Sequence, residues 1–96
     1  MSLFVVRHEH KPEACPAGHP EMGPMLIKHL SKPNAQSMGI DIRSEAVVDG
    51  AHTLFMILDA EDESKVQAFM TPFAQAGEVE IMPANVCEVV VERGRC

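Results

Sequence analysis

The sequence predicts one α+β domain over residues 1–96, with strands and helices in the order β-α-β-β-α-β. Short apolar stretches with the two-residue alternation of strands are separated by two segments with the 3.6-residue spacing of helices. The pair Asp49-Gly50, a strong hairpin signal, joins two of the strands. A length of 96 residues, 46% of them hydrophobic, suits one globular core.

The first expected strand is Leu3–His10, and it should be central because its apolar half carries residues on both faces. Side chains two residues apart share a face, so one face of this strand should carry Phe4, Val6, His8 and His10. A loop should follow over Lys11–Gly18, which holds two prolines and a glycine.

The first expected helix begins between Pro20 and Pro24. Its helical spacing predicts one apolar stripe made of Met22, Met25, Leu26, His29 and Leu30. Pro33 should block its continuation. The segment Asn34–Gly39 could form one further turn, with Asn34 as its cap and Gly39 as its stop.

Two strands, Ile40–Val48 and Thr53–Leu58, are expected on either side of the hairpin turn, and the continuously apolar second one should be central. A second helix should begin at Asp62 as its cap and end at Gly77, with a kink at Pro72. Its apolar stripe consists of Val66, Phe69, Met70 and Phe73.

The last expected strand is Glu78–Met82, broken at Pro83. An extended continuation over Val86–Val91 would place Cys87 and Val89 on one side, although the same residues could begin a helix.

This order of elements is that of ferredoxin-like folds, an antiparallel sheet with two helices on one face. Over nearly the whole chain it resembles the dimeric α/β-barrel superfamily, including its small uncharacterised bacterial members and its antibiotic-biosynthesis monooxygenase-like members. The resemblance implies two protomers that press their sheets together into a barrel, with sites between sheet and helices. That superfamily includes cofactor-free oxygenases, isomerases, haem-binding enzymes and metal-binding proteins. The members of that superfamily have no catalytic residues in common, so the resemblance assigns no catalytic residue to this chain.

Composition and charge limit the kinds of partner and the location expected for this chain. A net charge of −6 with eight scattered basic residues argues against nucleic acid. No apolar run is long enough for a membrane span, and the N-terminus does not resemble a signal peptide, so we expect a cytoplasmic protein with reduced thiols. A chain this short leaves apolar surface uncovered, which predicts a homodimer or a higher homo-oligomer.

The reactive side chains concentrate between His8 and His19. The imidazoles of His8 and His10 should leave one strand face, at a separation that lets two nitrogens meet one cation. The loop can then add a thiolate and a third imidazole, from Cys15 and His19. Such a set predicts a transition-metal site that could be redox-active, with zinc, iron, nickel or copper ahead of haem. The competing interpretation is a polar strand end with a surface loop, and Glu13 is a weaker alternative ligand to Cys15.

Cys87 has two interpretations. It could be a buried small hydrophobe. Alternatively, because the first and last strands are neighbours in ferredoxin-like folds, Cys87 could approach His8 or His10 as a fifth candidate ligand. Cys96 is expected to be an inert chain end, with a resolving thiol as the alternative.

Whether the chain is an enzyme stays undecided on sequence alone. One alternative to the metal-binding protein is an oxygenase- or isomerase-like enzyme, cofactor-free or haem-using, with a small apolar ligand in the cleft between sheet and helices and His29 as proton donor or haem ligand. Another is a thiol-based sulfur or redox protein, and a third is a structural subunit without chemistry. His52, after the hairpin turn, is expected to be solvated.

Overall fold

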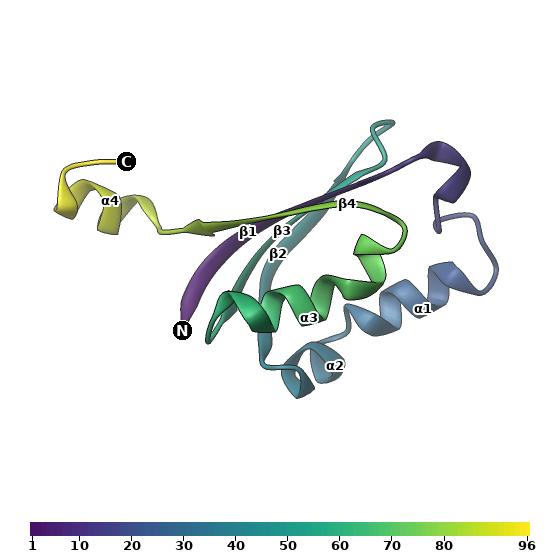
Figure 1. Cartoon of the computed structure of the whole chain (residues 1–96), viewed down its shortest axis with the longest axis horizontal. Coiled ribbons are helices and arrows are strands. Elements are labelled where there is room, and N and C mark those ends of the chain that lie inside the picture. The colour runs from purple at the N-terminus through teal and green to yellow at the C-terminus, as the bar shows by residue number, and fades with distance from the viewer.

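A four-stranded antiparallel sheet runs through the molecule, and the computed structural model describes all residues 1–96 (Figure 1). The strand order across the sheet is β2-β3-β1-β4. The strands are β1 (Ser2–His10), β2 (Ile40–Val48), β3 (Thr53–Ala60) and β4 (Gly77–Ala84). All four expected strands are therefore present, and the two strands expected to be central, β1 and β3, lie in the middle of the sheet.

The helices gather on one side of this sheet, apart from the last one. They are α1 (Met22–His29), α2 (Lys32–Ser37), α3 (Glu63–Ala74) and α4 (Cys87–Arg93), with a short 3-10 turn η1 at Pro12–Ala14. Figure 1 shows α1, α2 and α3 below the sheet, whereas α4 extends from the far end of β4. The arrangement is compatible with the expected ferredoxin-like fold. It adds α2, where one further turn was expected, and α4, where the sequence left strand and helix open.

The strand alternation expected for β1 is confirmed. Phe4, Val6 and His8 are buried on the helix side, while Val5 and Arg7 on the other side are half-buried. Strands β3 and β4 flank β1 in antiparallel register, so the face that carries the histidines belongs to the helix-covered side.

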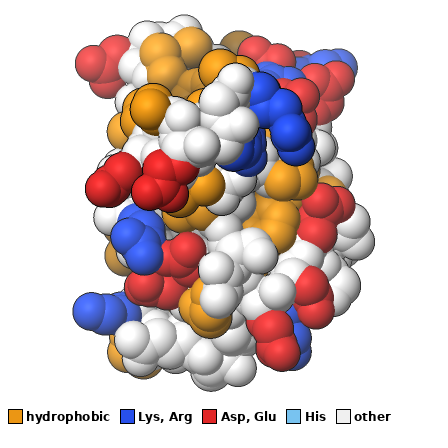
Figure 2. Space-filling view, turned by 90° about the vertical axis from the view of Figure 1, so that its left-hand side faces the viewer, with side chains coloured by type: hydrophobic (Ala, Val, Ile, Leu, Met, Phe, Trp, Pro, Cys, Tyr) orange, Lys and Arg blue, Asp and Glu red, His pale blue; other side chains and the backbone are white.

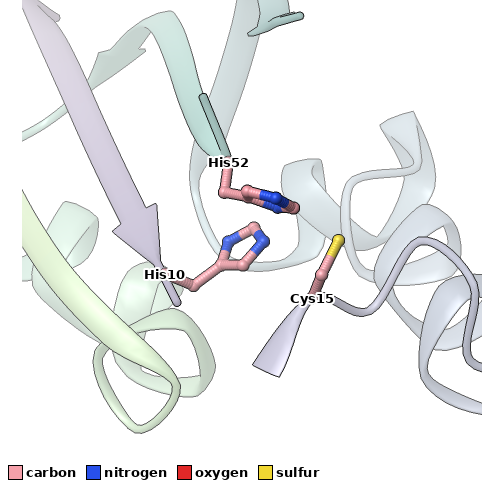
Figure 3. A group of neighbouring side chains, drawn as sticks. All are labelled: His10, Cys15 and His52. Carbon is pink, nitrogen blue, oxygen red and sulfur yellow. The ribbon is translucent and has the colours of Figure 1, made fainter. Parts of the chain in front are cut away.

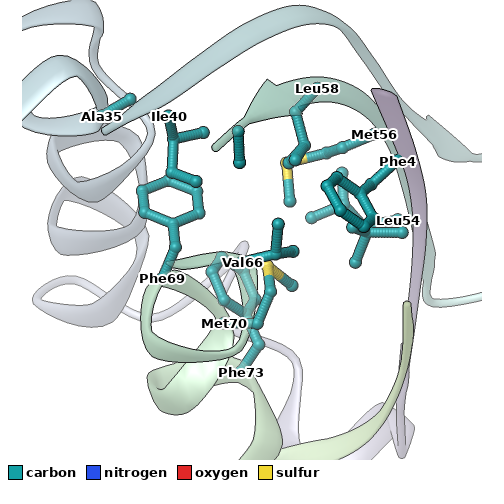
Figure 4. Packing of buried hydrophobic residues seen from close by; sticks show 12 residues of the cluster. Phe4, Ala35, Ile40, Leu54, Met56, Leu58, Val66, Phe69, Met70 and Phe73 are labelled. Atoms are coloured by element: carbon teal, nitrogen blue, oxygen red, sulfur yellow. The ribbon is translucent and has the colours of Figure 1, made fainter. Parts of the chain in front are cut away.

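The core lies between the sheet and α3 (Figure 4). All four apolar residues expected on this helix are buried, and the most completely enclosed side chains include Phe69, Met70, Met56 and Leu58. Burial of each such side chain contributes about 1.5–3 kcal/mol. Asp62 caps α3 as expected, because its carboxylate accepts a hydrogen bond from the backbone amide of Lys65 at 3.2 Å.

The segment after α1 differs in detail from the expectation. The first helix ends at His29, before Pro33, as expected, and Pro33 lies in the first turn of a separate helix, α2, where a missing amide hydrogen costs little. Ser31 occupies the cap position. The side chain of Asn34 instead donates to the carbonyl of His29 at 2.7 Å. Gly39 ends this turn with a φ of 76°, as expected.

The region of β4 corrects two expectations. Helix α3 ends at Ala74, so Gly77 does not end it and instead opens β4. A Cβ at Gly77 would lie 2.2 Å from the carbonyl oxygen of Glu9, so close packing of backbones explains this glycine. Pro83 does not break the strand either, because β4 is an edge strand and a proline there need not remove a ladder hydrogen bond.

The extended continuation expected over Val86–Val91 is wrong, and the alternative that these residues begin a helix is confirmed, because Cys87–Arg93 forms α4. Glu88 in its first turn and Arg93 in its last complement the helix dipole. Gly94, with a φ of 75°, terminates it. None of its residues is buried, and Cys87 is exposed, which also corrects its interpretation as a buried hydrophobe. No helix in the structure has both the length and the apolar character needed to cross a bilayer.

Candidate metal centre

Three side chains from separate segments converge at the end of β1: His10, Cys15 and His52. One ligand atom from each, two imidazole nitrogens and a sulfur, lie within 4.8 Å of one another. Figure 3 shows the two rings and the thiol pointing toward a common space. All three residues are partly buried. This is the only group of three or more metal-ligating side chains of this kind in the structure.

The backbone brings these residues together. His10 is the last residue of β1, and the antiparallel register that pairs Glu9 with Thr53 places His52 across from it. The amide of His10 donates to the carbonyl of His52 at 3.1 Å. Cys15 comes from the loop after η1, where its amide donates to the carbonyl of Pro12 at 3.2 Å.

His10 is the least satisfied member of the group. Both of its ring nitrogens are buried and neither has a hydrogen-bond partner. Burial lowers the pKa of His10, and the nearby His52 lowers it further. The neutral ring therefore keeps a lone pair available to a ligand at neutral pH.

His8 lies beside the group without belonging to it. Its ring centroid is 5.4 Å from that of His10, so the two imidazoles leave one strand face as expected. Its Nδ1 lies 3.1 Å from the carbonyl oxygen of Glu78 and donates to it, which leaves Nε2 as the nitrogen with a lone pair. Burial lowers the pKa of His8, outweighing the Glu78 hydrogen bond, which raises it.

The structure does not bring the other two candidate ligands to this point. His19 turns its Nδ1 toward the start of α1, where it accepts from the amides of Glu21 and Met22 at 3.1 and 3.0 Å. Cys87 follows the end of β4 that pairs with Leu3, whereas His10 pairs with Gly77 at the opposite end. These ends are separated by roughly 20 Å of strand. Figure 2, viewed from the α4 side, shows mixed acidic, basic and hydrophobic side chains and no histidine.

Sequence reasoning missed His52, which is partly buried instead of solvated. A signal was present. The hairpin at Asp49-Gly50 sets the start of β3, and an antiparallel neighbour of β1 must begin where β1 ends. The residue just before β3 should therefore lie beside His10.

A pocket of about 950 Å³ opens next to the group, between α1, the end of α3 and the sheet. His8, His10, Cys15 and His52 all line it. His29 also faces it, as the cleft interpretation expected, but its ring is engaged: Nε2 donates to the carbonyl of Phe69 at 2.8 Å and the ring stacks on Phe69 at 4.5 Å.

The fold and these side chains define a small α+β domain with one histidine–cysteine group beside an apolar pocket. A family model described as a domain of unknown function (DUF3303) matches residues 3–94. The match spans nearly the whole chain, so the chain belongs to this family. Neither the comparison with curated proteins nor the comparison with solved structures found a match.

Proposed function

We propose that the chain binds one transition-metal ion through His10, Cys15 and His52. Ligand atoms around a tetrahedral zinc, at about 2.0–2.3 Å from the ion, are roughly 3.3–3.8 Å apart. The three donor atoms already lie within 4.8 Å of one another, so small side-chain rotations would bring them into a coordination sphere. Thiolate with imidazole suits zinc, copper, iron or nickel better than calcium or magnesium.

The observation that carries this proposal is that the buried ring nitrogens of His10 have no hydrogen-bond partner. A buried polar group without a partner costs about 1–3 kcal/mol, and both ring nitrogens of His10 lack a partner while one of them faces the group. Coordination to a metal would satisfy one of them. Such a cost is hard to account for in a polar strand end that has no ligand.

The backbone at His52 has a φ of 49°, in the left-handed region that few non-glycine residues occupy. In a cytoplasmic setting, Cys15 would stay reduced and available as a thiolate ligand.

Three protein ligands would leave one tetrahedral position open, which is the pattern of catalytic rather than structural zinc sites. The open position would face the pocket, because all three ligands line it. His8 lies two residues before His10 on the same face of β1, with its ring centroid 5.4 Å from that of His10, within reach of a molecule bound there. The chemistry would be Lewis-acid activation with zinc, or electron transfer with copper or iron.

The experiment is metal analysis of protein purified without a histidine tag and then equilibrated with zinc. We expect about one ion per chain. His10→Ala should weaken zinc binding by more than about a hundredfold, since even indirect partners of metal ligands contribute 10–100-fold. His19→Ala, which removes an exposed imidazole outside the group, is the matched control. Equal zinc binding by both variants would refute the proposal.

We further infer a ferredoxin-like protomer that pairs with a second copy through the uncovered sheet face. No helix covers that face in Figure 1. At its centre Phe55 and Ile57 are 39% and 41% exposed, beside the half-buried Val5. Arg7 of the central strand β1, directly across from Phe55, forms an ion pair with Glu80 of the edge strand β4 at 3.2 Å. Aromatic residues and arginine are both enriched at protein interfaces.

A further inference from the structure

We propose that the pocket beside the metal centre binds a small amphipathic monocarboxylate, with its carboxylate on the metal and its apolar body against α1. This inference rests on the proposed metal site. It adds the chemical class of the ligand, which follows from the two walls of the pocket and from the charge of the ligand set.

The first wall is a helix whose apolar side is only partly covered. No residue of α1 is fully buried; Leu26 and Leu30 pack against the core, whereas Met22 and Met25 stay exposed. Met25 is 68% exposed, and it lines the pocket together with Met22 and Leu26. The helix is anchored at its C-terminal end, where His29 bonds to the Phe69 carbonyl, so the methionine-bearing part stands away from the sheet. Flexible methionines on such a surface adapt to ligands of different shape.

The second wall belongs to the core itself. Leu54 of β3 and Phe73 of α3 are buried residues whose surfaces reach the pocket, and Pro72 continues this wall. A concave space of about 950 Å³ with apolar walls and a few convergent polar groups is typical of small-molecule sites. The uncovered sheet face is the surface suited to a protein partner, so the pocket is left for a small ligand.

The charge of the ligand set selects the head group. Two neutral imidazoles and one thiolate leave a divalent ion with one net positive charge. Within an apolar pocket that charge is costly, and one anionic oxygen donor would neutralise it. Two exposed charged residues of opposite sign, Lys28 and Glu45, also line the pocket and offset each other. A monoanion is therefore favoured over a neutral ligand and over a cation.

Calorimetric titration of zinc-loaded and metal-free untagged protein tests this inference, with hexanoate, octanoate, decanoate and 4-phenylbutyrate as probes. Each added methylene should raise the affinity of the zinc-loaded protein about fourfold, because burial of one methylene contributes about 0.8 kcal/mol. Octanoate should bind at least about tenfold more weakly to metal-free protein, since a charge-assisted contact contributes about 1.5–3 kcal/mol. Octan-1-ol, which lacks the anionic head, should bind more weakly than octanoate to the zinc-loaded form.

A pair of variants separates the pocket from the metal. Met25→Glu places a negative charge on the pocket wall and should weaken octanoate binding at least about tenfold while leaving zinc affinity unchanged. Val91→Glu, which makes the same kind of change at a 77% exposed residue of α4, should alter neither. If zinc binds but none of the carboxylates does, or if octanoate binds equally with and without zinc, the inference is overturned while the metal site stands. If zinc itself does not bind, the proposed function fails first.

Discussion

The backbone amide of His10 donates to the backbone carbonyl of His52 over 3.1 Å. Two imidazoles from segments 42 positions apart in the sequence are thus brought together by the main chain, and their rings lie edge to face with centroids 5.3 Å apart. The geometry of the group should therefore survive side-chain substitution, so its members can be tested one at a time.

His52→Gly should separate metal binding from stability. Glycine adopts the left-handed φ of 49° without steric cost, so the free energy of unfolding of metal-free protein should stay within about 1 kcal/mol of the parent value. Zinc affinity should fall by more than about a hundredfold, because an imidazole ligand is lost. Chemical denaturation with a chelator present and zinc titration measure the two quantities. Unchanged zinc affinity would remove His52 from the ligand set.

Gly77→Ala should destabilise the fold by roughly 3 kcal/mol, because the new methyl group would overlap a neighbouring strand and force the backbone apart. Its Cβ would lie 2.2 Å from the carbonyl oxygen of Glu9 and 3.0 Å from the Cα of His10. Gly18→Ala is the matched control, since a Cβ there meets nothing within 4 Å. Equal midpoints of urea denaturation for the two variants would contradict the close β1–β4 packing.

Metal-free protein should lose stability as the pH falls below about 6.5, the ordinary pKa of histidine. The pKa values of His8 and His10 are both lowered in the folded state, chiefly by burial, so the unfolded chain takes up protons that the folded chain does not. The loss continues until the pH reaches the folded pKa values. Asp62, whose pKa lies below its ordinary 3.8, affects the pH dependence of stability only at lower pH.

His8→Gln is the variant that tests the source of this pH dependence. Glutamine can still donate to the Glu78 carbonyl but does not titrate, so the decline of unfolding free energy between about pH 7 and pH 5 should become shallower. Stability that rises on acidification of the parent protein would contradict the assignment.

Phe55→Glu should convert the proposed dimer into a monomer, because it places a charge at the apolar centre of the uncovered sheet face. Analytical ultracentrifugation of parent and variant measures the change. Val91→Glu, on α4, is the control that should keep the parent's mass. A parent protein that sediments as a monomer would contradict pairing through this face.

The sheet could be predicted from sequence because local signals agreed with the fold. Alternation in β1 and the Asp49-Gly50 turn located three strands, and the Asp62 cap located the start of α3. Helix α4 could not be recognised in the same way. Its valines favour strands by local propensity, and the charges at its ends, Glu88 and Arg93, are a weaker signal.

The candidate site was half predicted. His10 and Cys15 come from one continuous segment, so their proximity could be inferred from a strand followed by a short loop. His52 comes from another hairpin and required the register of β1 with β3. Cys87 was expected near His8 and His10 because β4 is a neighbour of β1. The two strands are antiparallel, however, so Cys87 follows the end of β4 that lies farthest from His10.

The most direct measurement is the absorption spectrum of untagged protein loaded with cobalt(II), a spectroscopic substitute for zinc. A thiolate-to-cobalt charge-transfer band should appear, vanish in Cys15→Ser, and persist in Cys87→Ser and Cys96→Ser, whose thiols are exposed and lie outside the group. Absence of that band in the parent protein, or its survival in Cys15→Ser, would contradict a metal held by His10, Cys15 and His52.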